Sequence, residues 1–93
     1  MTLLLKVEEV LDIQGRGPVI LPGISDSALN EVTVSRGDII ELRKPDGSCV
    51  VTHVEAIEFL DRRDRRSSVV VVLPAKFKKG DIAIGTEIWL RDP

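Results

Sequence analysis

The sequence predicts an all-β protein with a single domain that spans residues 1–93. Apolar residues never keep the i, i+3, i+4, i+7 spacing of an amphipathic helix through three turns. The apolar set is rich in β-branched residues, which favour the pleated surface of a sheet. Glycines and prolines divide the chain into six or seven short runs, a spacing that is typical of a small closed antiparallel β-barrel.

The first half of the chain begins with two expected strands joined by a tight turn. Residues 13–17 form this turn, because its two glycines both tolerate positive φ. Residues Ser25 to Glu31 follow the second strand as a polar loop, in which Ser25 or Asp26 caps one helical turn. The strands expected in this half are residues 3–12, 19–21, 32–34 and 38–43.

The second half contains the longest expected strand. The Pro-Asp-Gly sequence within residues 44–48 predicts a turn before it. Neither face of residues 49–60 is uniformly apolar, so we expect a bulge that switches the alternation. Residues 61–67 form a charged hairpin loop, and residues 69–73 are apolar on both faces, which is typical of a central strand. The strands expected in this half are residues 49–60, 69–73 and 86–91.

Two Gly-Asp-Ile tripeptides occupy residues 37–39 and 80–82, each after a basic residue. An aspartate in such a turn accepts hydrogen bonds from nearby backbone amides, so we expect Asp38 and Asp81 to do this.

Composition limits the class of protein. A chain of 93 residues with 43% hydrophobic and 30% charged residues fits one globular domain. The net charge of −2 gives no general attraction to nucleic acid or anionic lipid. No apolar run approaches the about 20 residues of a membrane span, and no basic segment precedes the first leucines. With Cys49 as its single cysteine, the chain is expected to be a soluble cytoplasmic protein with no membrane association.

Residues 7–17, Val-Glu-Glu-Val-Leu-Asp-Ile-Gln-Gly-Arg-Gly, followed by Val19-Ile20, are the most specific pattern in the chain. This pattern resembles the opening of the second domain of translational GTPases, especially elongation factor Tu. The resemblance covers nearly the whole chain and implies a closed Greek-key β-barrel of the translation-factor domain 2 type. Its later landmarks follow in the same order: Gly37-Asp38, Val54-Glu55, Val71-Val72-Leu73, Lys79-Gly80-Asp81-Ile82 and Gly85-Thr86.

In elongation factor Tu the second domain helps to hold the aminoacylated 3′ end of tRNA. The resemblance implies an apolar platform under the terminal adenine, carboxylates that accept from ribose or base, and a cation beside a phosphate. An alternative is that these residues remain from a shared barrel ancestry, with the glutamates solvated or paired with Arg16. The residues at the implied pocket are Glu8, Glu9, Leu11, Arg16 and Glu55.

The chain also departs from the family. It has Pro18-Val19-Ile20-Leu21-Pro22-Gly23 where the family usually has Thr-Val-Val-Thr-Gly after the Gly-Arg-Gly block. The loop Ser25 to Glu31 resembles an enlarged connection, and Pro74 stands where an arginine is common. No G-x-x-x-x-G-K-[ST] phosphate loop occurs in the sequence, so we expect no GTPase domain and no GTP hydrolysis.

The only concentrated basic patch lies in the charged loop, which could bind RNA phosphates. Asp61 and Asp64 alternate with its arginines, however, and the chain has no tyrosine that could stack on bases. A solvated loop whose charges compensate one another is therefore the alternative. The patch consists of Arg62, Arg63, Arg65 and Arg66, which Lys76, Lys78 and Lys79 would extend if they lie at the same end.

Residue types that support catalysis are scarce. His53 is the only histidine, and we expect it to pack or to hydrogen-bond within its strand. Cys49 is expected to be an inert buried thiol, and the acidic residues show no spacing typical of a general acid and base. We therefore expect no enzymatic activity, no cofactor and no metal.

These observations leave two functions. The first is a stand-alone, non-catalytic binding module that contacts RNA, the ribosome or a translation protein. The alternative is a protein–protein interaction module or a self-assembling accessory subunit, with residues 69–73, Trp89 and the loop Ser25 to Glu31 at its interface. The sequence does not identify the partner.

Overall fold

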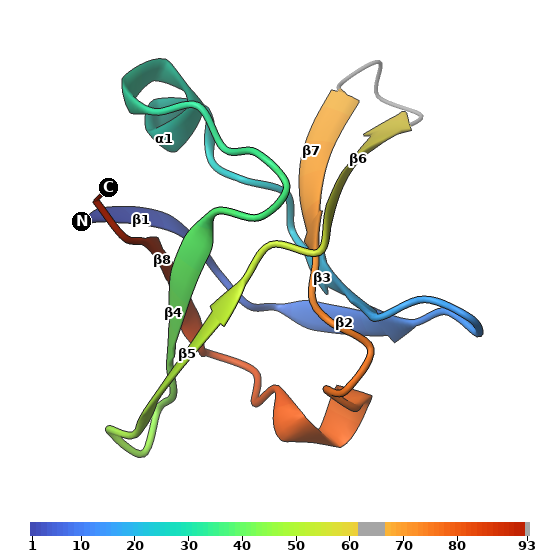
Figure 1. Ribbon diagram of the computed structural model, residues 1–93. Helices are drawn as coiled ribbons and strands as arrows, with labels where there is room; N and C mark the ends of the chain where they lie inside the picture. Colours follow the sequence, from blue (N-terminus) through green and yellow to red (C-terminus); the bar gives the residue numbers. More distant parts are fainter. Residues whose placement is uncertain (62–66, 93) are drawn as a thin grey trace.

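The computed structural model describes residues 1–61 and 67–92 and is mostly β. It contains two four-stranded antiparallel sheets, one in the order β1-β8-β4-β5 and the other in the order β2-β3-β7-β6 (Figure 1). The predicted predominance of β structure is confirmed, whereas no closed barrel is found among the described residues. The strands are β1 (Thr2–Lys6), β2 (Glu9–Asp12), β3 (Pro18–Leu21), β4 (Ile39–Arg43), β5 (Cys49–His53), β6 (Ala56–Asp61), β7 (Ser67–Val72) and β8 (Glu87–Leu90).

The chain passes from one sheet to the other at two corners. At the first corner the Val7 N–H donates to the Thr86 carbonyl at 2.8 Å, while the next N–H, of Glu8, donates to the Leu21 carbonyl at 2.9 Å. At the second, the Val54 N–H bonds to the Asp38 carbonyl and the Glu55 N–H to the Val72 carbonyl, each at 2.9 Å. Consecutive amides therefore bond to different sheets at both corners.

These corners explain where the expected strands differ from the observed ones. Residues 3–12 form two strands, β1 and β2, and residues 49–60 form β5 and β6. The alternation changes at Val54-Glu55 because the chain passes there between the sheets, and not through the expected bulge. The expected strand at residues 32–34 is wrong. The Val32 N–H instead donates to the Ala28 carbonyl at 2.9 Å and ends a helix, and the side chains of Val32 and Val34 pack against the core.

That helix, α1 (Asp26–Glu31), realises the single helical turn expected in the polar loop. Ser25 is its N-cap, and its Oγ accepts from the Ala28 N–H at 3.2 Å. Ala28 is 3% exposed and belongs to the main core, and α1 packs beside β1. The loop is therefore part of the packed fold.

The two Gly-Asp turns share a hydrogen-bond pattern, as expected. Asp38 accepts from the Ser35 N–H at 2.8 Å, and Asp81 accepts from the Lys78 N–H at 2.7 Å. The second turn contains a 3₁₀ helix, η1 (Lys79–Asp81), which lies against β2. The aspartates satisfy backbone donors that would otherwise lack a partner at these turns.

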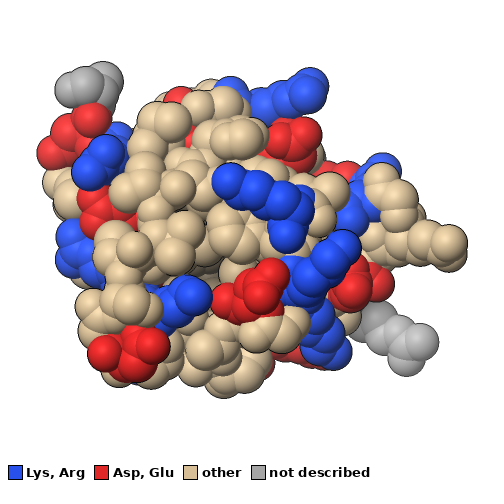
Figure 2. Space-filling view, turned by 60° about the horizontal axis from the view of Figure 1, so that its bottom comes forward, with Lys and Arg blue, Asp and Glu red and all other residues tan. Residues whose placement is uncertain are grey.

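Charges of both signs are interspersed on the surface. On the face in Figure 2, lysine and arginine side chains lie next to acidic side chains, as the small net charge of −2 suggests. Neither helical segment of the described ranges 1–61 and 67–92 has the length and apolar character needed to cross a bilayer.

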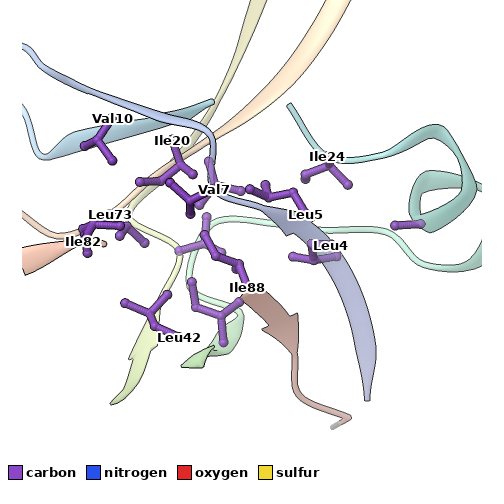
Figure 3. Packing of buried hydrophobic residues seen from close by; sticks show 14 residues of the cluster. Leu4, Leu5, Val7, Val10, Ile20, Ile24, Leu42, Leu73, Ile82 and Ile88 are labelled. Carbon is purple, nitrogen blue, oxygen red and sulfur yellow. The ribbon is translucent and has the colours of Figure 1, made fainter. Parts of the chain in front are cut away.

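The main core lies between the two sheets. Residues in and beside α1 and η1 complete it. The labelled side chains of Figure 3 point toward one another from both sheets, including Leu4 and Ile88 from one and Ile20 from the other. Ile24, before α1, and Ile82, after η1, add to the same cluster. Burial of these aliphatic side chains supplies the main stabilisation, at roughly 25 cal/mol per Å² of apolar surface removed from water.

Candidate binding site

A second, smaller apolar cluster lies on the outer face of the β2-β3-β7-β6 sheet. Its centre is Val19, Val70 and Val72, each at most 2% exposed. Side chains alternate across a strand, so these valines point away from the main core, which Ile20 and Val71 enter from the same strands. Partly buried apolar side chains at Leu11, Leu21 and Ala56 pack around the three valines.

A pocket of about 360 Å³ opens beside this cluster, at the end of the sheet that carries the β2–β3 turn. Val72 and Ala56 contribute apolar surface to its wall. Arg16 comes from the β2–β3 turn, and Glu55 from the corner before β6. Two of the five residues expected at a common site, 39 positions apart in the sequence, thus line one pocket.

The pocket also contains two charged residues that the sequence did not indicate, Arg36 and Glu58. Glu58 shares the outer face of β6 with Ala56, because the two are separated by one residue. Arg36 precedes Gly37 in the first Gly-Asp turn. In the sequence, Arg36 is distinguished only as the basic residue before that turn. No local pattern indicates that it lies in the same pocket as Arg16.

Both acidic residues of the pocket, Glu55 and Glu58, have a side-chain partner. Neither pairing is one that the sequence suggested. The Arg16 Nη1 donates to Glu58 Oε1, whereas the alternative of shared ancestry had Arg16 paired with Glu8 or Glu55. Glu55 Oε2 instead lies 3.0 Å from His53 Nε2. All four side chains are between 29% and 53% exposed, so water competes for both pairs and an incoming ligand can replace either at small cost.

The remaining expected residues lie elsewhere on the same sheet. Glu8 and Glu9 are exposed and line a separate pocket with Leu21 and Pro22. Leu11 is half-buried on the outer face of β2, two residues from Glu9 and beside the valine cluster. The structure therefore brings together Arg16 and Glu55, places Leu11 on the adjoining apolar surface, and puts Glu8 and Glu9 in a different pocket from Arg16 and Glu55.

The expected basic patch divides at the limit of the described residues. Arg62, Arg63, Arg65 and Arg66 lie outside them. Of the lysines that could extend it, Lys76 is exposed, with its Nζ 5.4 Å from the centroid of the Phe77 ring. Its neighbour Ala75 lines the pocket with Arg16, so the segment of Lys76, Lys78 and Lys79 begins at the pocket rim.

Cys49 lies on the other sheet, and it is exposed rather than buried as expected. Partial desolvation, and a contact of 3.4 Å with Glu41 Oε1, raise the pKa of its thiol above 9.0. A thiol with a raised pKa is less ionised at neutral pH, so its low reactivity stays a prediction, now with an electrostatic reason. Within the described part of the chain, no three His, Cys, Asp or Glu side chains converge on a metal site.

No protein-family model matches the chain, and no curated protein or solved structure matches it either.

Proposed function

We propose that the chain is a non-catalytic binding module of the translation apparatus, which contacts RNA through the outer face of the β2-β3-β7-β6 sheet. The observation that carries this proposal is the presence of Arg16 and Glu55 in one pocket beside an apolar surface. A sugar–phosphate end with an attached base presents an anion, hydroxyl groups and a flat apolar face. The pocket offers a partner for each of these groups.

In this proposal Arg16 and Arg36 neutralise phosphate oxygens, and Glu55 or Glu58 accepts from ribose hydroxyl or base amino groups. The base lies on the partly buried side chains of Leu11 and Ala56, which pack against the valine cluster. Arg16 leaves Glu58 for a phosphate, which is inexpensive because an exposed ion pair contributes only about 0–1 kcal/mol.

The fold part of the proposal is a closed Greek-key barrel of the translation-factor domain 2 type. Its support is the pair of corners, at which β1 continues into β2 and β5 continues into β6. Each continuous pair belongs to both sheets. If each continuous pair is counted as one member, the proposed barrel has six members, and the chain is unbroken at both corners.

The test is binding of purified, fluorescently labelled tRNA and of purified ribosomes, measured by anisotropy and by co-sedimentation. Arg16→Ala and Glu55→Ala each lower the affinity about 5- to 100-fold, as expected for loss of one hydrogen bond to a charged group. Affinity also falls steeply between about 50 mM and about 200 mM KCl, because phosphate contacts release counterions.

Matched controls are Lys44→Ala and Glu31→Ala, which remove the same types of charge from the β4–β5 turn and from α1. Both controls should bind like the wild type, and all four variants should keep their thermal unfolding midpoints within a few degrees. The proposal is refuted if wild-type protein binds neither probe at the lower salt concentration, or if the controls lose as much affinity as the pocket variants.

The self-assembly alternative loses one of its expected surfaces. In residues 69–73 the side chains of Val70, Val71, Val72 and Leu73 are at most 2% exposed, so packing within the chain already occupies them. Trp89, another of the expected surfaces, lies on the outer face of the β1-β8-β4-β5 sheet.

A further inference from the structure

The outer face of the β1-β8-β4-β5 sheet is an ordered grid of side chains. The strand registers place Leu3 opposite Trp89, Trp89 opposite Glu41, and Glu41 opposite Val51, so these four residues form one row across all four strands. A second row contains Glu87 opposite Arg43, on the two central strands. These side chains point away from the core, because Ile40 and Leu42 on β4 and Ile88 on β8, which alternate with them, are fully buried.

The periphery of this face is apolar and exposed. Met1, Leu3, Ile39 and Val51 are 43%, 39%, 46% and 48% exposed, respectively. These four make up a large share of the exposed large hydrophobic side chains in the described ranges. Exposed aliphatic residues around a tryptophan and arginines are typical of protein interfaces, in which tryptophan and arginine dominate the binding energy.

The centre of the face is held rigid by polar contacts. The Arg43 guanidinium lies 4.5 Å from the centroid of the Trp89 ring, and Trp89 Nε1 donates to Glu87 Oε1 at 3.1 Å. Glu41 is only 9% exposed and accepts from Arg91 Nε at 2.9 Å and from Arg43 Nε at 3.5 Å. The largest side chain of the surface is therefore fixed before any partner arrives, which lowers the entropy cost of association.

We infer that this face pairs with the same face of a second copy of the chain, around a twofold axis parallel to the strands. Such an axis reverses the strand order of one copy, so β1 faces β5 and β8 faces β4. Leu3 of each copy then meets Val51 of the other. Glu87 of each copy meets Arg43 of the other.

Charge complementarity is the reason for choosing a second copy as the occupant. The symmetry forms two apolar contacts between Leu3 and Val51 and two ion pairs between Glu87 and Arg43. It also places Trp89 of each copy against Glu41 of the other, and it aligns no like charges in these rows. Two sheets that pack face to face in this way resemble the layers of a β-sandwich.

The dimensions of the face predict a weak dimer. The grid covers about 14 Å across four strands and about 14 Å along them, from the standard strand spacing and rise. The contact is thus on the order of a few hundred Å² per copy, below the about 800 Å² of a standard interface. A dissociation constant in the micromolar range or weaker follows.

Sedimentation velocity and intrinsic fluorescence, with a reducing agent present, test this inference. Trp89 is the only tryptophan of the chain, so its emission reports on this face alone. Between about 5 µM and about 500 µM, a range suited to a weak interface, the sedimentation coefficient should rise and the Trp89 emission maximum should shift. A single monomeric species with constant emission over this range overturns the inference.

Two substitutions locate the contact. Val51→Lys introduces two lysines opposite exposed leucines and should weaken association at least tenfold, while its exposed position spares the fold. The matched control is Ile84→Lys, because Ile84 is 62% exposed and lies outside the grid. Equal loss of association in both variants would assign the dimer to another surface and overturn the inference.

A charge exchange tests the proposed symmetry. Glu87→Lys places like charges opposite Arg43 and should weaken association about fivefold or more, whereas Glu87→Lys with Arg43→Glu should recover part of the loss. No recovery in a folded double variant overturns the twofold arrangement. RNA binding by the opposite sheet is measured separately and is unaffected by any of these results.

Discussion

Two glycines of the β2–β3 turn have different physical roles, and this difference predicts opposite tolerance to substitution. Gly15 has φ of +82° and faces open space, so only its backbone conformation favours glycine. Gly17 is buried and outside the positive φ region. A Cβ at Gly17 would overlap the Leu73 carbonyl oxygen and lie 2.8 Å from the carbonyl carbon of the same residue.

The cost of Gly17→Ala follows from the contacts that would have to move. Overpacking against fixed backbone costs about 1–3 kcal/mol. The adjoining hydrogen bond from the Leu73 N–H to the Pro18 carbonyl, 2.9 Å long, would be strained or lost at a further cost of about 1 kcal/mol. The expected loss is thus about 2–4 kcal/mol, against a total stability of about 5–14 kcal/mol for a chain of this length.

Thermal and urea unfolding of four variants separates the two roles. Gly17→Ala should lower Tm by about 8–30 °C, since 1 kcal/mol corresponds to about 4–8 °C in a small domain. Gly15→Ala should cost about 1–2 kcal/mol, and Gly15→Asn less, because asparagine adopts the left-handed conformation readily. Gly17→Asn should be at least as damaging as Gly17→Ala. If Gly17→Ala melts within about 2 °C of the wild type, the close approach to Leu73 is wrong.

Three further predictions concern single side chains. Ser25→Ala removes the oxygen that caps α1 and should cost about 1 kcal/mol in urea unfolding, whereas Ser25→Asp should retain most of the stability. The hydrogen bond from Arg91 lowers the pKa of Glu41 below 4.5, so its stabilising contribution is present above pH 4.5 and is lost as pH falls through the lowered value. The free energy of unfolding of Glu41→Gln should therefore lie below that of the wild type at neutral pH and converge with it in acid; a constant difference would contradict this. Because desolvation and the neighbouring carboxylate raise the pKa of Cys49, its alkylation by iodoacetamide at pH 8 should be slower than that of a free cysteine and should accelerate in Glu41→Gln.

Local chemistry predicted the turns and the central strands. The Pro-Asp-Gly turn forms as expected, with the Gly47 N–H bonded to the Lys44 carbonyl and Asp46 Oδ1 accepting from the Ser48 N–H. β7 is central in its sheet, as its run of apolar residues on both faces indicates. Such features depend on residues within a few positions of one another, and a sequence displays them directly.

The corners, by contrast, were not predictable from alternation. A pattern of period two is the same whether a strand pairs with one sheet or passes to the next, so residues 3–12 appear as one strand. Val32 and Val34 show the opposite failure, because β-branched residues favour strands only where a neighbouring strand is available.

The candidate site was predictable only in part, because a local pattern does not show which distant segments come together. The resemblance placed Arg16 and Glu55 at a common site, and they line one pocket. Glu58 reaches that pocket on β6, and Arg36 reaches it from the loop before β4, where the Gly37 N–H donates to the Val54 carbonyl. No local pattern reports that these two residues lie beside Arg16. Glu41 likewise acquires its buried environment from Arg91, 50 residues away in the chain.

The two corners also determine how the protein should come apart. Neighbouring amides at Val7 and Glu8 are anchored in different sheets, so neither sheet can open without pulling on the other through a single peptide unit. Domains whose halves lack such links often open in separate cooperative units. Here we expect the slowest-exchanging amides of both sheets to share one free energy of opening, equal to that of global unfolding.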